Sequence, residues 1–140
     1  MSLHRRDLQK LAVAKADDAE LLFQNGRYSN AYYLFGYAAE MALKARIAGM
    51  AFAAEAIPDK RFVNDVYTHD LNKLAQLAGL AQLIRAMREA EPVFDANWAT
   101  VSEWTEQSRY EVIDVFLSTA MRSAMVEGEF GVFQWLQNNW

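Results

Sequence analysis

The N-terminal part of the chain has apolar residues at the spacing of an amphipathic helix. On a 3.6-residue wheel its apolar face holds Leu8, Leu11, Ala12, Ala19 and Leu22. Asn25 and Gly26 follow, and these residue types best tolerate the left-handed conformation that ends a helix. The pattern therefore predicts a first helix over residues 5–24.

The segment from Tyr32 to Gly49, YYLFGYAAEMALKARIAG, is apolar or small around most of a helical wheel. Ser29 or Asn30 can cap this second helix, which we expect to continue to about Met50 over a length on the order of 30 Å. Two of its three lengthwise stripes contain only apolar or small residues. The helix is therefore predicted to lie in the centre of the fold, packed on at least two sides.

Shorter elements are predicted in the middle of the chain. Residues 51–69 are expected to form a frayed extension and then a loop. Thr68 can cap a short helix over residues 70–78. Further helices are predicted over residues 80–91 and 92–104, the second of which begins with a proline, a residue favoured at helix starts.

The C-terminal part is expected to form a connector over residues 105–114 and one long helix over residues 115–138. One stripe of that helix would hold Leu117, Met121, Ala124, Gly128, Val132 and Trp135. Sustained alternation of apolar and polar residues is absent from the sequence, so strands are not expected. The chain is predicted to be a single domain over residues 1–140, an all-α bundle with four main helices.

The composition fits a soluble globular protein and limits its chemistry. Hydrophobic residues make up 53% and charged residues 23%, and the charge-free stretches are shorter than the ~20 residues of a bilayer span. Cysteine is absent and the only histidines are His4 and His69, so disulfides, thiolate metal sites and a multi-histidine zinc site within one chain are excluded.

The N-terminus lacks the apolar region of a signal peptide. A cytoplasmic protein without membrane contact, metal or cofactor is expected. Its net charge of -4 argues against broad nucleic-acid binding but leaves a local basic patch open.

The remaining stripe of the central helix carries two opposite charges one turn apart, Glu40 and Lys44. An exposed pair of this kind would stabilise the helix by ~0.2–0.5 kcal/mol. Alternatively, this stripe lines a polar cleft between helices. Charges held away from water cost several kcal/mol unless they are partnered, so the cleft would need further polar groups. The candidates for these groups are His69, Arg109 and Tyr110.

Four segments occur in an order and spacing that resemble the HEPN domain family. They are a helix end with Gly-x-Tyr at residues 26–28, Ala-x-Glu-x-x-Leu-Lys at 38–44, a helix start with His-x-Leu at 69–71, and Arg-Tyr at 109–110. Trp104 precedes the last of these. The resemblance covers about residues 8–137, nearly the whole chain.

The resemblance implies an up-and-down bundle of four to five helices that commonly forms a homodimer. HEPN domains are often encoded beside, or fused to, a minimal nucleotidyltransferase. One group of them comprises metal-independent RNases of toxin and defence systems, marked by an arginine, four to six residues and then a histidine. The other group lacks this motif and is taken to bind nucleotides or a protein partner.

This sequence departs from the RNase pattern. Arg61 is the nearest arginine before His69, seven residues separate them, and they flank an expected loop. Metal-independent RNA cleavage needs a base for the 2′-hydroxyl and a cation for the developing phosphorane charge. We therefore expect a non-catalytic module of a toxin–antitoxin or defence-type system that binds a nucleotide, RNA or a nucleotidyltransferase partner. An RNase using His69 and a nearby arginine is the alternative.

The expected ligand-binding residues are Glu40, Lys44, His69, Arg109 and Tyr110. Each also has a structural interpretation. His69 could merely orient a carboxylate, and Arg109 could clamp Glu40 instead of holding a phosphate or carboxylate ligand. Tyr110 and Trp104 could be core aromatics or base-stacking surfaces.

The C-terminal segment FGVFQWLQNNW is rich in large apolar side chains: Phe130, Phe133, Trp135, Leu136 and Trp140. These cannot all face one side of a single helix, so something else must cover some of them. A second subunit would do so, which favours a homodimer. The alternative cover is the first helix of the same chain.

Overall fold

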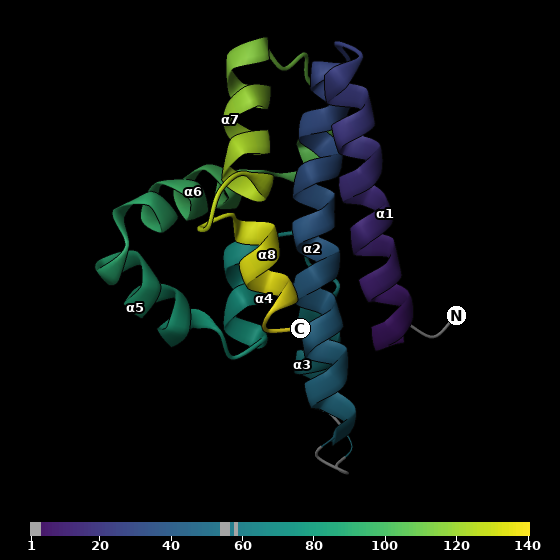
Figure 1. The fold of residues 1–140 in the computed structure, drawn as a ribbon. Coiled ribbons are helices and arrows are strands. Elements are labelled where there is room, and N and C mark those ends of the chain that lie inside the picture. The colour runs from purple at the N-terminus through teal and green to yellow at the C-terminus, as the bar shows by residue number, and fades with distance from the viewer. Residues whose placement is uncertain (1–3, 54–56, 58) are drawn as a thin grey trace.

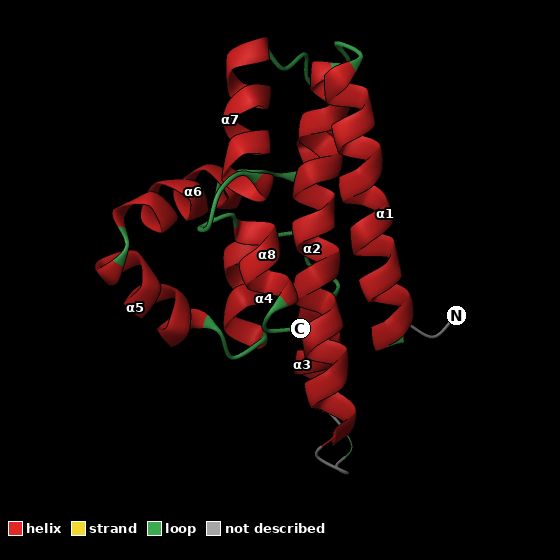
Figure 2. Ribbon diagram, in the orientation of Figure 1, coloured by secondary structure: helices red, strands yellow, loops and turns green. Residues whose placement is uncertain are grey.

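The computed structural model describes residues 4–53, 57 and 59–140, and the regular elements in these ranges are all helical (Figures 1 and 2). The elements are α1 (Arg5–Gln24), α2 (Tyr28–Ala53), α3 (Lys60–Val66), α4 (Leu71–Leu77), α5 (Ala81–Ala90), α6 (Pro92–Ser102), the 3₁₀ helix η1 (Glu106–Tyr110), α7 (Val115–Val126) and α8 (Val132–Gln137). The all-α class predicted from the sequence is confirmed. In the ranges described, none of the helices combines the length and the apolar character needed to cross a bilayer.

The helices α1 and α2 form an antiparallel pair along the length of the molecule (Figure 1). α1 has the predicted bounds, and its end is set by Gly26, whose φ of +76° is the left-handed conformation expected of a helix stop. Small residues of α1 are buried where it meets α2, which lets the two backbones lie close: Ala12, Ala16 and Ala19.

α2 is the central helix, as predicted. It contacts α1, α4, α7, α8 and η1, and Phe35, Leu43 and Ile47 on it are buried. The helix begins at Tyr28, earlier than predicted, so Ser29 lies in its first turn and is not the cap. The hydroxyl of Ser29 instead accepts a hydrogen bond from the backbone N–H of Ile113, 2.9 Å away, which ties the start of α7 to the start of α2.

The segment predicted as a loop contains the short helix α3, which the sequence analysis missed. Its cap is Asp59, whose side chain accepts a hydrogen bond from the N–H of Arg61 at 2.9 Å. The next helix, α4, is capped by Asp70 and not by Thr68. The Thr68 hydroxyl accepts from the N–H of Asp70 itself, at 3.2 Å. Residues 54–56 and 58 of the predicted loop lie outside the described residues.

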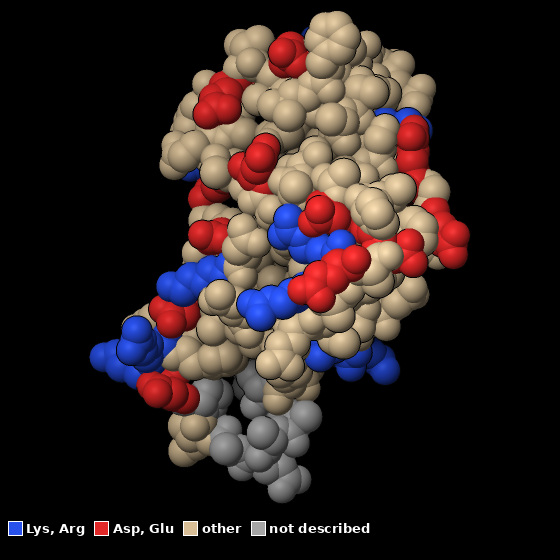
Figure 3. All heavy atoms as spheres, turned by 90° about the vertical axis from the view of Figure 1, so that its left-hand side faces the viewer, with Lys and Arg blue, Asp and Glu red and all other residues tan. Residues whose placement is uncertain are grey.

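The helices α5 and α6 match the two predicted in this region, and together they form a V-shaped arm beside the bundle (Figure 1). The arm is held at α6, where Phe94, Trp98 and Val101 are buried. This side of the molecule faces the viewer in Figure 3, where basic and acidic side chains alternate over the lower half.

The long C-terminal helix predicted over residues 115–138 is wrong, because the chain turns between α7 and α8. Gly128 has φ +70°, which a helix cannot contain. A Cβ added to Gly131 would lie 2.9 Å from the carbonyl oxygen of Met125, so the turn is closed too tightly for a side chain. The predicted stripe from Leu117 to Trp135 is therefore split between two helices.

The aromatic C-terminal segment is covered by its own chain. Phe133 and Leu136 are buried, and the ring of Trp135 lies 5.4 Å from that of Phe94 on α6. Trp140 packs edge-on against Phe133, and its backbone carbonyl accepts a hydrogen bond from Arg5 of α1. This segment therefore needs no second subunit to cover it.

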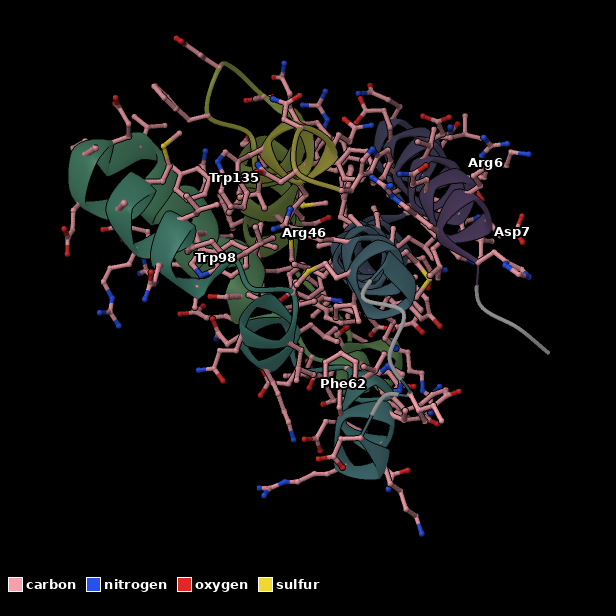
Figure 4. All side chains as sticks on the ribbon, turned by 90° about the horizontal axis from the view of Figure 1, so that it is seen from below. Arg6, Asp7, Arg46, Phe62, Trp98 and Trp135 are labelled. Carbon is pink, nitrogen blue, oxygen red and sulfur yellow. The ribbon has the colours of Figure 1, made fainter. Side chains whose placement is uncertain are left out.

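Arg46 of α2 joins this segment to the rest of the bundle. Its guanidinium donates to the carbonyl of Ala78 at 2.8 Å and to the carbonyl of Asn139 at 2.7 Å. In Figure 4 the side chain extends from α2 toward the region of Trp135 and Trp98. The ends of α4 and α8 are thus held by one side chain.

Candidate functional site

Glu40 and Lys44 form an ion pair inside the bundle. They are 0% and 7% exposed, and the Lys44 Nζ lies 3.2 Å from the Glu40 Oε2. The interpretation of these residues as an exposed surface pair is therefore wrong. Because both charges are removed from water, the pair has to be stabilised by further polar contacts.

His69 supplies the first of these contacts. It directly precedes the Asp70 cap of α4, which places its ring against α2. The Nδ1 atom lies 2.8 Å from the Glu40 Oε1, and the Nε2 atom lies 2.9 Å from the Oε2 of Glu106. An ionised carboxylate only accepts hydrogen bonds, so a ring N–H is the group that suits each of these contacts. The histidine therefore bridges two carboxylates.

Glu106, which the sequence analysis missed, continues the network toward the surface. Its Oε1 lies 3.0 Å from the Nη1 of Arg109, one turn further along η1. Arg109 therefore pairs with Glu106, and the interpretation in which it clamps Glu40 is wrong. The ionic contacts run from Lys44 through Glu40, His69 and Glu106 to Arg109. We call this set of five residues the polar network.

Tyr110 lies at the outer end of the polar network without an ionic contact to it. It is 74% exposed, so its interpretation as a core aromatic is wrong. The Arg109 guanidinium carbon lies 4.8 Å from the centre of its ring, a cation–π contact. We call Arg109 and Tyr110 together the Arg109–Tyr110 platform.

The interpretation of Trp104 as a core aromatic is confirmed. It is 2% exposed and lies against Gly36, where an added Cβ would be 2.2 Å from the indole ring. The centre of the Tyr33 ring lies 6.0 Å from the centre of the indole ring system. Tyr37 packs edge-on against the same indole, with 6.4 Å between the ring centres. The indole nitrogen is buried and has no hydrogen-bond partner among the described residues.

Burial of the two tyrosines near this tryptophan affects their ionisation. Burial raises the pKa of Tyr33, and the nearby negative charge of Glu106 adds to this. Burial also raises the pKa of Tyr37, where the charge of Glu40 contributes next. Both phenols therefore stay neutral beside the carboxylates of the network.

A hollow of about 350 Å³ opens where the network reaches the surface. It is lined by Thr68, His69, Asp70, Asn72, Ser102, Trp104, Thr105, Glu106 and Gln107. The buried pair Glu40 and Lys44 does not line it, so these two predicted ligand-binding residues lie behind the wall of the hollow. The lining is polar, but the described part of the chain contains no group of three side chains that could hold a metal ion.

A second hollow, of about 570 Å³, lies between α4, α5 and α6, away from the predicted site residues. Its lining combines the apolar Ile84 and Trp98 with Arg85, Arg88 and Asp95. Arg88 and Asp95 pair with each other. The sequence carries no signal for this hollow, because its lining residues come from three separate helices.

The structure thus brings Glu40, Lys44 and His69 into direct contact and joins Arg109 to them through Glu106. It leaves Tyr110 on the surface beside Arg109. Comparison of the chain with protein-family models, with curated proteins and with solved structures finds no match.

Proposed function

We propose that this chain is a non-catalytic, HEPN-like helical binding module, and that it binds a nucleotide at the Arg109–Tyr110 platform. The observation that carries the proposal is the stacking of a fixed guanidinium on a tyrosine ring that is 74% exposed. Glu106 fixes that guanidinium from the protein side through one of its nitrogens.

Each part of a nucleotide has a matching group at this place. The open face of Tyr110 suits a base, because stacking of a base on an aromatic side chain contributes ~1–3 kcal/mol. The nitrogens of Arg109 that do not face Glu106 suit a phosphate, which the planar guanidinium can hold through two hydrogen bonds. Ribose hydroxyls could donate to the carboxylates that line the hollow, Asp70 and Glu106.

The environment of His69 favours binding over catalysis. Both of its ring nitrogens already face carboxylate oxygens at 2.8 and 2.9 Å, so a 2′-hydroxyl would have to displace one of these contacts to reach either nitrogen. Arg61, the nearest preceding arginine, lies exposed in the first turn of α3 and has no ionic contact with His69 among the described residues. These contacts support a structural role for His69, which holds Glu106 and through it Arg109.

The resemblance to HEPN domains carries the proposal further. On that basis we place the module in a toxin–antitoxin or defence-type system, as a homodimer that works with a minimal nucleotidyltransferase. These parts of the proposal rest on the sequence motifs alone, and each can be tested once the ligand is known.

Calorimetry with ATP, GTP and short RNAs tests the nucleotide proposal directly. We expect binding by the wild type, and affinity about tenfold or more lower for Arg109→Ala and for Tyr110→Ala, because each removes one part of the platform. Arg85→Ala, which removes an exposed arginine from α5, is the matched control and should bind like the wild type. Absence of binding by all the nucleotides, or equal losses in Arg109→Ala and Arg85→Ala, would refute the proposal.

Incubation of EDTA-treated protein with labelled RNA tests the RNase alternative. We expect the RNA to remain intact. Cleavage that disappears in both His69→Ala and the milder His69→Gln, in protein that remains folded, would establish the RNase and overturn the non-catalytic assignment.

A further inference from the structure

The outward side of α7 carries no charge along the length of the helix. On a helical wheel this side holds Phe116, Thr119, Ala120, Ser123 and Val126, and Val112 lies just before the helix in the connector; we call these six residues the α7 face. Val112 and Phe116 on it are 97% and 82% exposed. The one charged residue of α7, Arg122, points toward α1 instead, where it binds Glu20.

The α7 face is fixed in this exposed position. The opposite side of the helix is buried in the bundle through Ser118, Met121, Ala124 and Met125. Rotation of the helix to hide Phe116 would therefore expose these residues. Covering a large apolar side chain is worth ~1.5–3 kcal/mol, and a group of such residues on one surface marks an interaction site more often than single ones do. The face is thus suited to a partner that covers it.

Carboxylates lie at both ends of the α7 face. Glu111 and Asp114 are exposed at its start, and Glu127 and Glu129 are exposed at its end. Glu127 is paired with Arg122, which also binds Glu20, whereas Glu111, Asp114 and Glu129 have no ionic contact among the described residues. In Figure 3 the upper part of the molecule is mostly tan with separate red side chains, and most of the blue side chains lie in the lower half. The face is an apolar strip with acidic ends.

We propose that the α7 face binds an amphipathic helix of a partner protein, whose apolar stripe is flanked by lysine or arginine. A helix of about three turns matches the length of the face, and an amphipathic helix presents its apolar anchors at this helical spacing. Basic side chains at both ends of that stripe would meet the carboxylates of Glu111 and Asp114 at one end and of Glu129 at the other. Complementary charges of this kind select the partner and its orientation.

The same charges select against the other occupants of an apolar strip. A second copy of the chain, paired on this face in either orientation, would bring acidic ends together, and like-charge contacts are unfavourable. Nucleic acid and anionic membranes would meet the same carboxylates with phosphate groups. A basic helix is the occupant that satisfies both the apolar strip and its ends. The inference is independent of the nucleotide proposal, which uses Arg109 and Tyr110.

Two designed peptides test the inference. Each is a helix of about fourteen residues with leucine and alanine on one face. One has lysine at the flanking positions and the other has glutamate at the same positions. We expect fluorescence anisotropy to show binding of the lysine peptide only, and its affinity should fall as salt is raised. Phe116→Ser should weaken this binding about tenfold or more, because the variant removes the central anchor.

Leu83→Ser is the matched control, because Leu83 is an exposed apolar residue on α5, 52% exposed, and its loss should leave the affinity unchanged. The combined variant Glu111→Gln and Glu129→Gln should weaken binding and reduce its salt dependence. Equal binding of the two peptides, or an unchanged affinity in Phe116→Ser, would overturn the inference. So would a wild-type dimer in sedimentation equilibrium that Phe116→Ser converts to a monomer, because the face would then serve a second copy. Nucleotide calorimetry on Phe116→Ser should match the wild type, so the two proposals can fail separately.

Discussion

The indole ring of Trp104 lies directly on the backbone of Gly36, and no side-chain atom fits between them. A Cβ at Gly36 would lie 2.2 to 2.3 Å from three atoms of the ring, a separation that steric repulsion forbids. The contact joins the middle of α2 to the segment that leads into η1. It therefore sets where Glu106 and Arg109 lie relative to Glu40.

We predict that Gly36→Ala destabilises the protein. In the interior of a helix, replacing glycine by alanine normally stabilises by ~0.5–1 kcal/mol. Here the added methyl group must displace a buried indole, and overpacking of this kind costs ~1–3 kcal/mol or more. The steric cost exceeds the helix gain, so urea unfolding should show a lower free energy of unfolding.

Gly49→Ala is the control, in the same helix. Its added Cβ would lie 3.1 Å from the Cδ of Arg5, whose exposed side chain needs to shift by only a few tenths of an ångström and can keep its hydrogen bond to the Trp140 carbonyl. The variant should be as stable as the wild type or more stable by ~0.5–1 kcal/mol. If the Gly36 and Gly49 variants have the same stability, the contact with Trp104 does not constrain the fold.

Glu40→Gln should be strongly destabilising. Glu40 is 0% exposed and touches both Lys44 and His69, so the substitution leaves a buried ammonium without its anion. Removal of one partner from a buried pair costs ~3–5 kcal/mol. The double variant Glu40→Gln with Lys44→Met should recover much of this loss, because no buried charge then lacks a partner.

The corresponding change at an exposed pair provides the comparison. Lys73 and Asp65 lie 3.4 Å apart with partly exposed side chains. Asp65→Asn should therefore cost at most about 1 kcal/mol. Chemical denaturation of both single variants distinguishes the cases. A loss below 1 kcal/mol for Glu40→Gln would mean that the pair behaves as if it were in water.

The two ends of the predicted first helix could be found from the sequence because the signals for them are local. An apolar face and a terminal Asn25–Gly26 fix α1 whatever surrounds it. The break between α7 and α8 has no such signal. A glycine within a helical pattern is tolerated at about 1 kcal/mol, and only the tertiary packing shows that Gly128 and Gly131 form a turn. The short helix α3 was missed because the segment has little periodicity.

The sequence predicted four members of the polar network, namely Glu40, Lys44, His69 and Arg109, but it did not predict Glu106, which joins Arg109 to the others. Glu40 and Lys44 interrupt an otherwise apolar helix, so burial forces them to find partners, and His69 is a residue that can provide one. Glu106 lies in a connector, where no periodicity assigns it a face. One turn of 3₁₀ helix brings Glu106 and Arg109 together, and that turn depends on the position of Trp104. The exposure of Tyr110 follows from the same turn and could not be read from its residue type.

Arg46→Met should loosen the C-terminal segment. The guanidinium donates to the carbonyls of Ala78 and Asn139 at the ends of α4 and α8. Methionine keeps the unbranched apolar stem of the side chain but has no donor, so two part-buried carbonyls lose their partner. We expect a loss of ~1–3 kcal/mol in the free energy of unfolding. In hydrogen exchange, the substitution should increase the exchange rate of amides in α8 more than that of amides in α1.

Arg46→Lys and Arg85→Met separate geometry from charge in this prediction. Lysine retains the positive charge but cannot place two donors in the same plane, so its stability should lie between those of the wild type and Arg46→Met. Arg85 is exposed on α5, and its replacement by methionine should change stability by less than ~0.5 kcal/mol. Similar losses at positions 46 and 85 would show that the carbonyl contacts of Arg46 contribute nothing.

The ion pair between α1 and α7 should make stability depend on pH in the acid range. Arg122 donates to both carboxylate oxygens of Glu20, at 2.7 and 2.8 Å. This hydrogen bonding lowers the pKa of Glu20 in the folded protein. A carboxyl group with a lower pKa in the folded state contributes stability above its ordinary pKa, and this contribution is lost as the pH falls through the folded value. Arg122→Gln should therefore be less stable than the wild type at pH 7.

The size of this effect is limited because Glu20 is partly exposed, with 37% of its side-chain surface accessible. Screening by solvent keeps the loss at pH 7 at about 1 kcal/mol or less. Urea unfolding of the wild type and of Arg122→Gln between pH 7 and pH 3 measures the difference, which should shrink toward zero as Glu20 becomes protonated. Glu20→Gln should lose the same part of the pH dependence, because it removes the titrating group itself. The difference in free energy of unfolding between wild type and Arg122→Gln could instead stay constant down to pH 3. The stabilisation by Arg122 would then come from packing against Phe23 and not from the charge of Glu20. The guanidinium carbon lies 5.2 Å from the centre of the Phe23 ring.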